Sequence, residues 1–223
     1  MPFFDTPDSL PPSLFYTLSG SSNNTSILII HGWTADSHDW SWQISFLVET
    51  HHVIAMDLRG HGKSAAPKGV SYTPQTQAKD AAALLRHLKY EKDIVVMGHS
   101  MGSVTASALA VQEPDLIKAI VLVDPPYWAP AAIHVIRDCL GGLYDEGNLG
   151  RESVNLAFVE EKRKCPRLAV YAKGEDCDKE RALGMGPLDE VASIEGQGHW
   201  IMQMKSEEFN EMLGGWLGNL GKS

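Results

Sequence analysis

The chain has 223 residues, of which 43% are hydrophobic and 21% charged, the proportions of an ordinary globular protein with one sizeable core. Its formal net charge is −9, and no basic stripe is present that could neutralise phosphates. Nucleic acid and an anionic membrane are therefore not expected as main partners, which leaves a small-molecule substrate or ligand open.

The N-terminal segment, MPFFDTPDSLPPSLFY, has no basic residue and no long apolar run. We expect neither a signal peptide nor a membrane span there. Short apolar runs rich in β-branched residues then recur along the chain. They are residues 26–30, 52–56, 94–97, 119–123 and 167–172, with a weaker sixth run at 190–194. Such runs are typical of strands buried on both faces, as in a parallel sheet.

Helical patterns lie between these runs. One begins at Thr73, a candidate N-cap, followed by Pro74 at the first helical position, and continues to about residue 90. Another follows Ser206, a second candidate N-cap, with apolar residues at helical spacing through Leu217. Alternating strands and helices predict an α/β fold: a doubly wound, mostly parallel sheet with helices on both faces.

Residues 125–164 break the alternation, since they contain no strand signal. We interpret the chain as a single domain, 1–223, in which 125–164 form a reduced lid over the carboxyl ends of the strands. Tyr127 and Trp128 would then line the substrate pocket with apolar surface. The alternative is a single crossover helix with irregular loops.

The sequence GHSMG, residues 98–102, lies between a predicted strand and a predicted helix. G-x-S-x-G in this context predicts a sharp turn that exposes the hydroxyl of Ser100 as a nucleophile. Gly98 and Gly102 would leave room for the neighbouring strand and helix. The hydroxyl would lie at the positive end of a helix, where an oxyanion is favoured.

Five segments together resemble the α/β-hydrolase fold family over nearly the whole chain: IIHGWTAD, DLRGHGKS, GHSMGS, VLVDPP and EGQGHW. The resemblance implies that His199, in a Gly-rich loop after the last strand, is the base that activates Ser100. It also implies an oxyanion hole formed by the backbone N–H groups of Trp33 and Met101.

The resemblance leaves the third member of the catalytic triad open. Most of the family carry the acid after the seventh strand, where Asp176 fits best and Glu175 and Asp178 are alternatives. A minority carry it at the end of the sixth strand, where Asp124 stands. We favour Asp124, because it follows the strand directly and is therefore rigid, whereas the helix after Asp176 looks eroded by glycine and proline.

Other site chemistries have less support. The sequence has no H-E-x-x-H motif and no Cys/His cluster, so neither a metal nor another cofactor is expected. The three cysteines are odd in number and lack C-x-x-C spacing, which favours reduced thiols in a cytoplasmic protein. The expected function is a cofactor-free serine hydrolase acting on carboxylic esters, lactones or thioesters. The alternatives are a C–C bond hydrolase or lyase with the same residues, and a non-catalytic binding protein of this fold.

Overall fold

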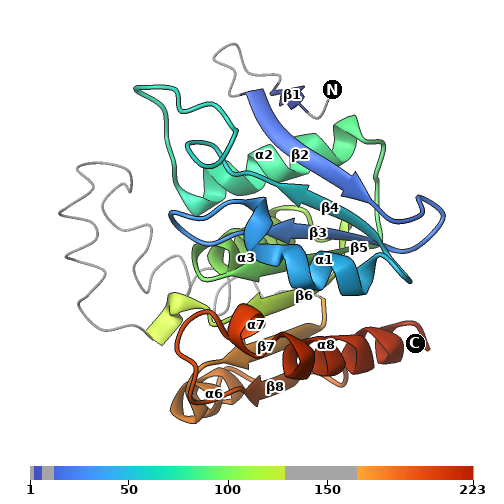
Figure 1. The fold of residues 1–223 in the computed structure, drawn as a ribbon, viewed down its shortest axis with the longest axis vertical. Coiled ribbons are helices and arrows are strands. Elements are labelled where there is room, and N and C mark those ends of the chain that lie inside the picture. The colour runs from blue at the N-terminus through green and yellow to red at the C-terminus, as the bar shows by residue number, and fades with distance from the viewer. Residues whose placement is uncertain (1–2, 7–12, 129–164, 223) are drawn as a thin grey trace.

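The computed structural model describes residues 3–6, 13–128 and 165–222, apart from the side chain of Trp128. They form one eight-stranded sheet in the order β1-β2-β4-β3-β5-β6-β7-β8 (Figure 1). The strands are β1 (Phe3–Asp5), β2 (Ser13–Ser19), β3 (Ser26–Ile30), β4 (His52–Met56), β5 (Ile94–His99), β6 (Ile117–Val123), β7 (Arg167–Tyr171) and β8 (Glu190–Ser193). The pairs β1–β2 and β2–β4 are antiparallel, and all the others are parallel.

Helices cover both faces of the sheet. The helical segments are η1 (Ser37–Trp40), α1 (Ser41–Leu47), α2 (Pro74–His87), α3 (Met101–Gln112), η2 (Pro126–Trp128), α6 (Gly174–Arg181), α7 (Ile201–Met204) and α8 (Ser206–Leu220). In Figure 1, α1 and α8 lie in front of the sheet, and α2 and α3 lie behind it. In the described part of the chain, no helix combines the length and the apolarity that a membrane crossing requires.

The alternation of side chains along the parallel strands divides the core into two halves. In β3, Leu28 and Ile30 pack toward α2 and α3, whereas Ile27 and Ile29 pack toward η1, α1 and α8. All five residues of β3 are buried. Both faces of the strand are covered, which explains why it reads in the sequence as a continuous apolar run rather than an alternating one.

The predicted fold class is confirmed, and each of the six predicted strands is present. Thr73 caps α2 as expected, because its side chain accepts a hydrogen bond from the N–H of Thr76. The second predicted cap was wrong: Ser206 is the first residue of α8, and the N-cap is Lys205, which makes no side-chain capping bond. The proposed lid lies outside the described residues from position 129 onward.

Candidate active site

The chain turns sharply between β5 and α3, with Ser100 alone between them. The backbone of Ser100 has φ 53° and ψ −119°, a conformation that L-residues rarely adopt and that the surrounding structure must enforce. A Cβ on Gly98 would lie 2.2 Å from the carbonyl oxygen of Gly102. A Cβ on Gly102 would lie 2.4 Å from the carbonyl oxygen of Ile30. Both glycines are therefore needed for this turn.

Asp124 follows the last residue of β6 and also has a positive φ, of 42°. Its N–H donates to the carbonyl of Val170 at 2.7 Å, so its backbone continues the pairing of β6 with β7. Its Oδ1 accepts the N–H of Ala172 at 2.9 Å. These contacts fix the carboxylate at the carboxyl end of the sheet and leave Oδ2 directed away from β7.

Oδ2 of Asp124 lies 2.5 Å from Nδ1 of His199. Asp176, the other candidate acid, pairs instead with Lys179 at 2.7 Å. The helix that looked eroded in the sequence is present as α6, and Asp176 is in its first turn. An acidic residue is favoured there by the positive end of the helix dipole, which accounts for Asp176 without any contact to His199.

His31 holds the loop after β3 in one conformation. Its Nε2 accepts the N–H of Leu58 at 2.9 Å, so the ring proton is on Nδ1, which donates to the carbonyl of Gly32 at 2.6 Å. That carbonyl and the N–H of Trp33 belong to one planar peptide and point in opposite directions. His31 thereby sets the direction of the Trp33 N–H. The hypothetical Cβ of Gly32 would lie 3.3 Å from Cβ of Ser100, so this loop borders the serine.

His99 connects the turn at Ser100 to the segment that carries His199. Its Nε2 lies 2.9 Å from the carbonyl oxygen of His199, and the two rings are 4.6 Å apart between centroids. From the sequence, His31 is expected in the turn that carries the oxyanion loop and His99 is expected to point away from the site, but the hydrogen bonds that they make are not predicted. The sequence feature that indicates a structural role is their position at the ends of predicted strands, where His31 directly precedes Gly32 and His99 directly precedes Ser100.

The two expected pocket residues have different outcomes. Tyr127 is buried in the core, where its hydroxyl lies 2.6 Å from that of Ser107 on α3. The polar end of Tyr127 is thus bonded inside the protein, and its role in lining the substrate pocket stays a prediction. The side chain of Trp128 lies outside the described part of the chain.

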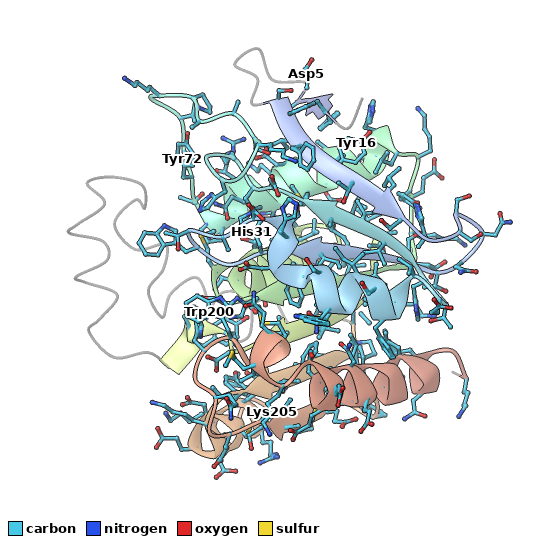
Figure 2. All side chains as sticks on the ribbon, in the orientation of Figure 1. Asp5, Tyr16, His31, Tyr72, Trp200 and Lys205 are labelled. Carbon is cyan, nitrogen blue, oxygen red and sulfur yellow. The ribbon has the colours of Figure 1, made fainter. Side chains whose placement is uncertain are left out.

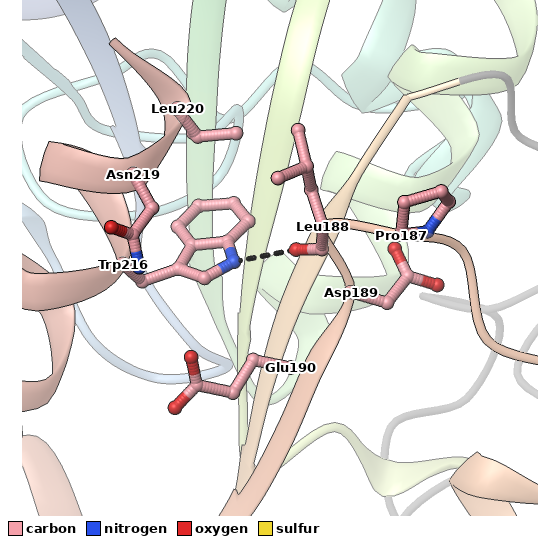
Figure 3. A pocket seen from close by; sticks show the side chains of 7 residues that line it. All are labelled: Pro187, Leu188, Asp189, Glu190, Trp216, Asn219 and Leu220. Atoms are coloured by element: carbon pink, nitrogen blue, oxygen red, sulfur yellow. Dashed lines mark hydrogen bonds between the residues drawn. The ribbon is translucent and has the colours of Figure 1, made fainter. Parts of the chain in front are cut away.

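The described residues enclose a hollow of about 150 Å³ between α8 and the start of β8 (Figure 3). The indole nitrogen of Trp216 donates to the carbonyl of Leu188 at 2.9 Å across it. None of the candidate site residues lines this hollow. It is therefore separate from the group formed by Ser100, Asp124 and His199.

Stability should fall steeply in mild acid because of two buried histidines. Burial is the main factor that lowers the pKa of His31 and of His99 from 6.5 to about 4. Below pH 6.5 the unfolded chain therefore binds more protons than the folded one. The free energy of unfolding is highest above pH 6.5 and falls as the pH drops toward 4. Each of the two histidines should lower the free energy of unfolding by about 3 kcal/mol between pH 6.5 and pH 4.

Urea unfolding midpoints between pH 7.5 and 4.5 would measure this loss. The variant His99→Gln removes one of the two groups and should reduce the slope of unfolding free energy against pH by up to about 1.4 kcal/mol per pH unit. An unchanged slope would show that folding does not lower the pKa of His99.

A sequence model described as the alpha/beta hydrolase fold matches residues 25–146, more than half of the chain. Epoxide hydrolase 3 of Xenopus tropicalis is 30% identical over 120 residues, which are 53% of this chain and 32% of that protein. An esterase of Mycobacterium tuberculosis is 39% identical over 98 residues, which are 44% of this chain and 32% of that protein. The chain thus matches about a third of the length of these curated relatives.

Likeness to solved structures extends over the whole fold. The enol-lactonase from Burkholderia xenovorans LB400 superposes with a TM-score of 0.71 at 20% identity, covering 97% of this chain and 100% of that one. This identity establishes the architecture and not the reaction. With the matching family model and the eight-stranded sheet, it leads to one conclusion: the chain belongs to the α/β-hydrolase fold family.

Proposed function

We propose that this chain is a serine hydrolase that cleaves a carboxylic ester, lactone or thioester through an acyl-enzyme. The observation that carries the proposal is the 2.5 Å contact between Nδ1 of His199 and Oδ2 of Asp124, beside the turn that presents Ser100. A carboxylate on Nδ1 keeps the proton there and leaves Nε2 free to act as a base.

In the proposed mechanism, His199 removes the proton of Ser100 as the hydroxyl attacks the substrate carbonyl. His199 then protonates the leaving group, and water releases the acyl group by the reverse use of the same residues. Asp124 stabilises the imidazolium that forms during each half of the reaction. The backbone N–H groups of Trp33 and Met101 would receive the oxyanion, the second of them at the positive end of α3.

The nucleophile favours acyl transfer over the ring opening implied by the name of the epoxide hydrolase relative. Opening an epoxide through an alkyl ester intermediate requires a carboxylate as the nucleophile, and this chain has the hydroxyl of Ser100 at that position. Esters, lactones and thioesters have leaving groups that need less protonation than an amine does. They are therefore the proposed substrate classes.

Covalent labelling would test the proposal directly. A fluorophosphonate should react once per chain, and peptide mass spectrometry should locate the adduct on Ser100, because only an activated serine attacks phosphorus at a useful rate. Prior incubation with p-nitrophenyl acetate should slow labelling and release a burst of p-nitrophenol. A folded protein that is not labelled, or that is labelled at another serine, would exclude this function.

A further inference from the structure

His99 is the last residue of β5 and directly precedes Ser100, yet its side chain is directed into the protein and is 1% exposed. Its Nε2 lies 2.9 Å from the carbonyl oxygen of His199. A carbonyl oxygen only accepts hydrogen bonds, so Nε2 carries the ring proton and donates it. The bond therefore joins the proposed nucleophile segment to the backbone of the proposed base.

The other edge of the same ring faces the loop after β3. A Cβ on Gly32 would lie 2.9 Å from Nδ1 of His99, which has no hydrogen-bond partner among the described residues. The ring also packs at 6.4 Å from Trp40 and 6.0 Å from Trp200, measured between centroids. Trp200 and His31, which belong to the two loops on either side of His99, are labelled in Figure 2.

The loop that carries His199 contains two glycines with positive φ. Gly196 and Gly198 have φ values of 85° and 68°, and neither would bring a Cβ within 4 Å of another atom. Asp124 holds the imidazole of His199 at one atom, but a single bond to the ring does not fix the backbone that bears it. The bond from His99 supplies a second, independent restraint.

We infer that His99 is a positioning residue, which holds the base segment in register with Ser100 by donating a hydrogen bond to the carbonyl of His199. The inference rests on the function proposed above, because it matters only if His199 acts on Ser100. Loss of this donor would remove the hydrogen bond that holds the carbonyl of His199 and let the segment move. A displacement of about 1 Å at a reacting group can cost about 100-fold in rate.

The charge state of His99 suits this role. Burial, together with the charges of His199 and His31, lowers the pKa of His99 to about 4. The hydrogen bond to the His199 carbonyl and the charge of Asp124 act in the opposite direction but are smaller. A neutral ring can donate from Nε2 without opposing the positive charge that His199 must acquire. A protonated His99 would place a second cation beside that imidazolium.

Two substitutions separate the hydrogen bond from the packing of the ring. In His99→Gln, the amide nitrogen occupies the position of Nε2 and can donate to the same carbonyl. In His99→Leu, a side chain of similar size has no donor. His52→Leu is the matched control. His52 is also buried and bonds to Tyr90 at 2.6 Å, but it is the first residue of β4 and so lies at the amino ends of the parallel strands, away from Ser100.

Steady-state hydrolysis of p-nitrophenyl acetate, with a melting curve for each variant, tests the inference. His99→Leu should lower kcat by about tenfold to 100-fold with KM little changed, and His99→Gln should recover most of that loss. His52→Leu should lower the melting temperature and leave kcat unchanged. If His99→Leu does not fold, His99→Asn replaces it, since its shorter amide cannot reach the carbonyl of His199.

Two results would overturn the inference: wild-type kcat in His99→Leu, or equal loss of kcat in His99→Gln and in the variants without the donor. If the fluorophosphonate labels Ser100 of the wild-type protein, either result would refute the role of His99 and leave the proposed function intact. A wild-type protein that neither labels nor turns over ester would refute the proposed function as well.

Discussion

Replacing Ser100 by alanine is expected to lower kcat for ester hydrolysis by about 10⁴-fold or more, because it removes the oxygen that forms the acyl-enzyme in the proposed mechanism. The substitution removes one oxygen and leaves both described backbone hydrogen bonds of Ser100 in place: its N–H donates to the carbonyl of Val123, and its carbonyl accepts the N–H of Ser103, each at 2.9 Å. The folded structure should therefore persist, which circular dichroism and a melting curve can check.

Ser107→Ala is the matched control for this prediction. Ser107 lies on the same helix, and its hydroxyl is bonded to Tyr127 inside the core. Its loss should lower stability by about 1 kcal/mol and leave ester hydrolysis intact at temperatures below the melting transition. More than about a thousandth of wild-type activity in purified Ser100→Ala would remove this serine as the nucleophile.

The parallel strands could be predicted because they are buried on both faces, which leaves continuous apolar runs in the sequence. The antiparallel strands β1 and β2 were missed. Residues 13–19 of β2 mix buried and partly exposed positions and directly follow a proline-rich segment, so no such run is present. Helix α6 was missed for another reason: its sequence, GEDCDKER, buries only Cys177 and Glu180 and has no apolar face.

Helix α6 did carry a signal of a different kind. Glu175 and Asp176 stand in its first turn, and Lys179 and Arg181 stand in its last, the charge order that complements a helix dipole. Reading this order would have placed Asp176 on a helix and given it a local reason to be acidic. Apolar periodicity alone could not place Asp176 on a helix, because a short surface helix need not have an apolar face.

The choice of acid depends on backbone geometry that the sequence does not encode locally. Both Asp124 and Asp176 follow strands of the same sheet, at the edge where parallel strands end. What distinguishes them is the positive φ of Asp124, which directs one carboxylate oxygen to Ala172 and the other to His199. That conformation depends on β7 lying beside β6, a tertiary contact.

Asp124→Asn should lower kcat by several orders of magnitude with KM little changed. The amide keeps the shape of the carboxylate, and its oxygen can still accept the N–H of Ala172. Its NH₂ group then faces Nδ1 of His199, which favours the tautomer with the proton on Nε2, so that His199 can no longer accept the proton of Ser100. In the template Ser-His-Asp enzyme the same exchange costs about 10⁴-fold.

Asp176→Asn is the matched control, with an expected cost below about tenfold. Its carboxylate pairs with Lys179 in a partly exposed ion pair, a kind of contact that contributes little to stability because water screens it. Measuring kcat and KM for both variants with one ester decides between the two arrangements. A large loss of kcat in Asp176→Asn together with a small loss in Asp124→Asn would place the catalytic acid after β7. Similar partial losses in both would mean that either carboxylate can support His199.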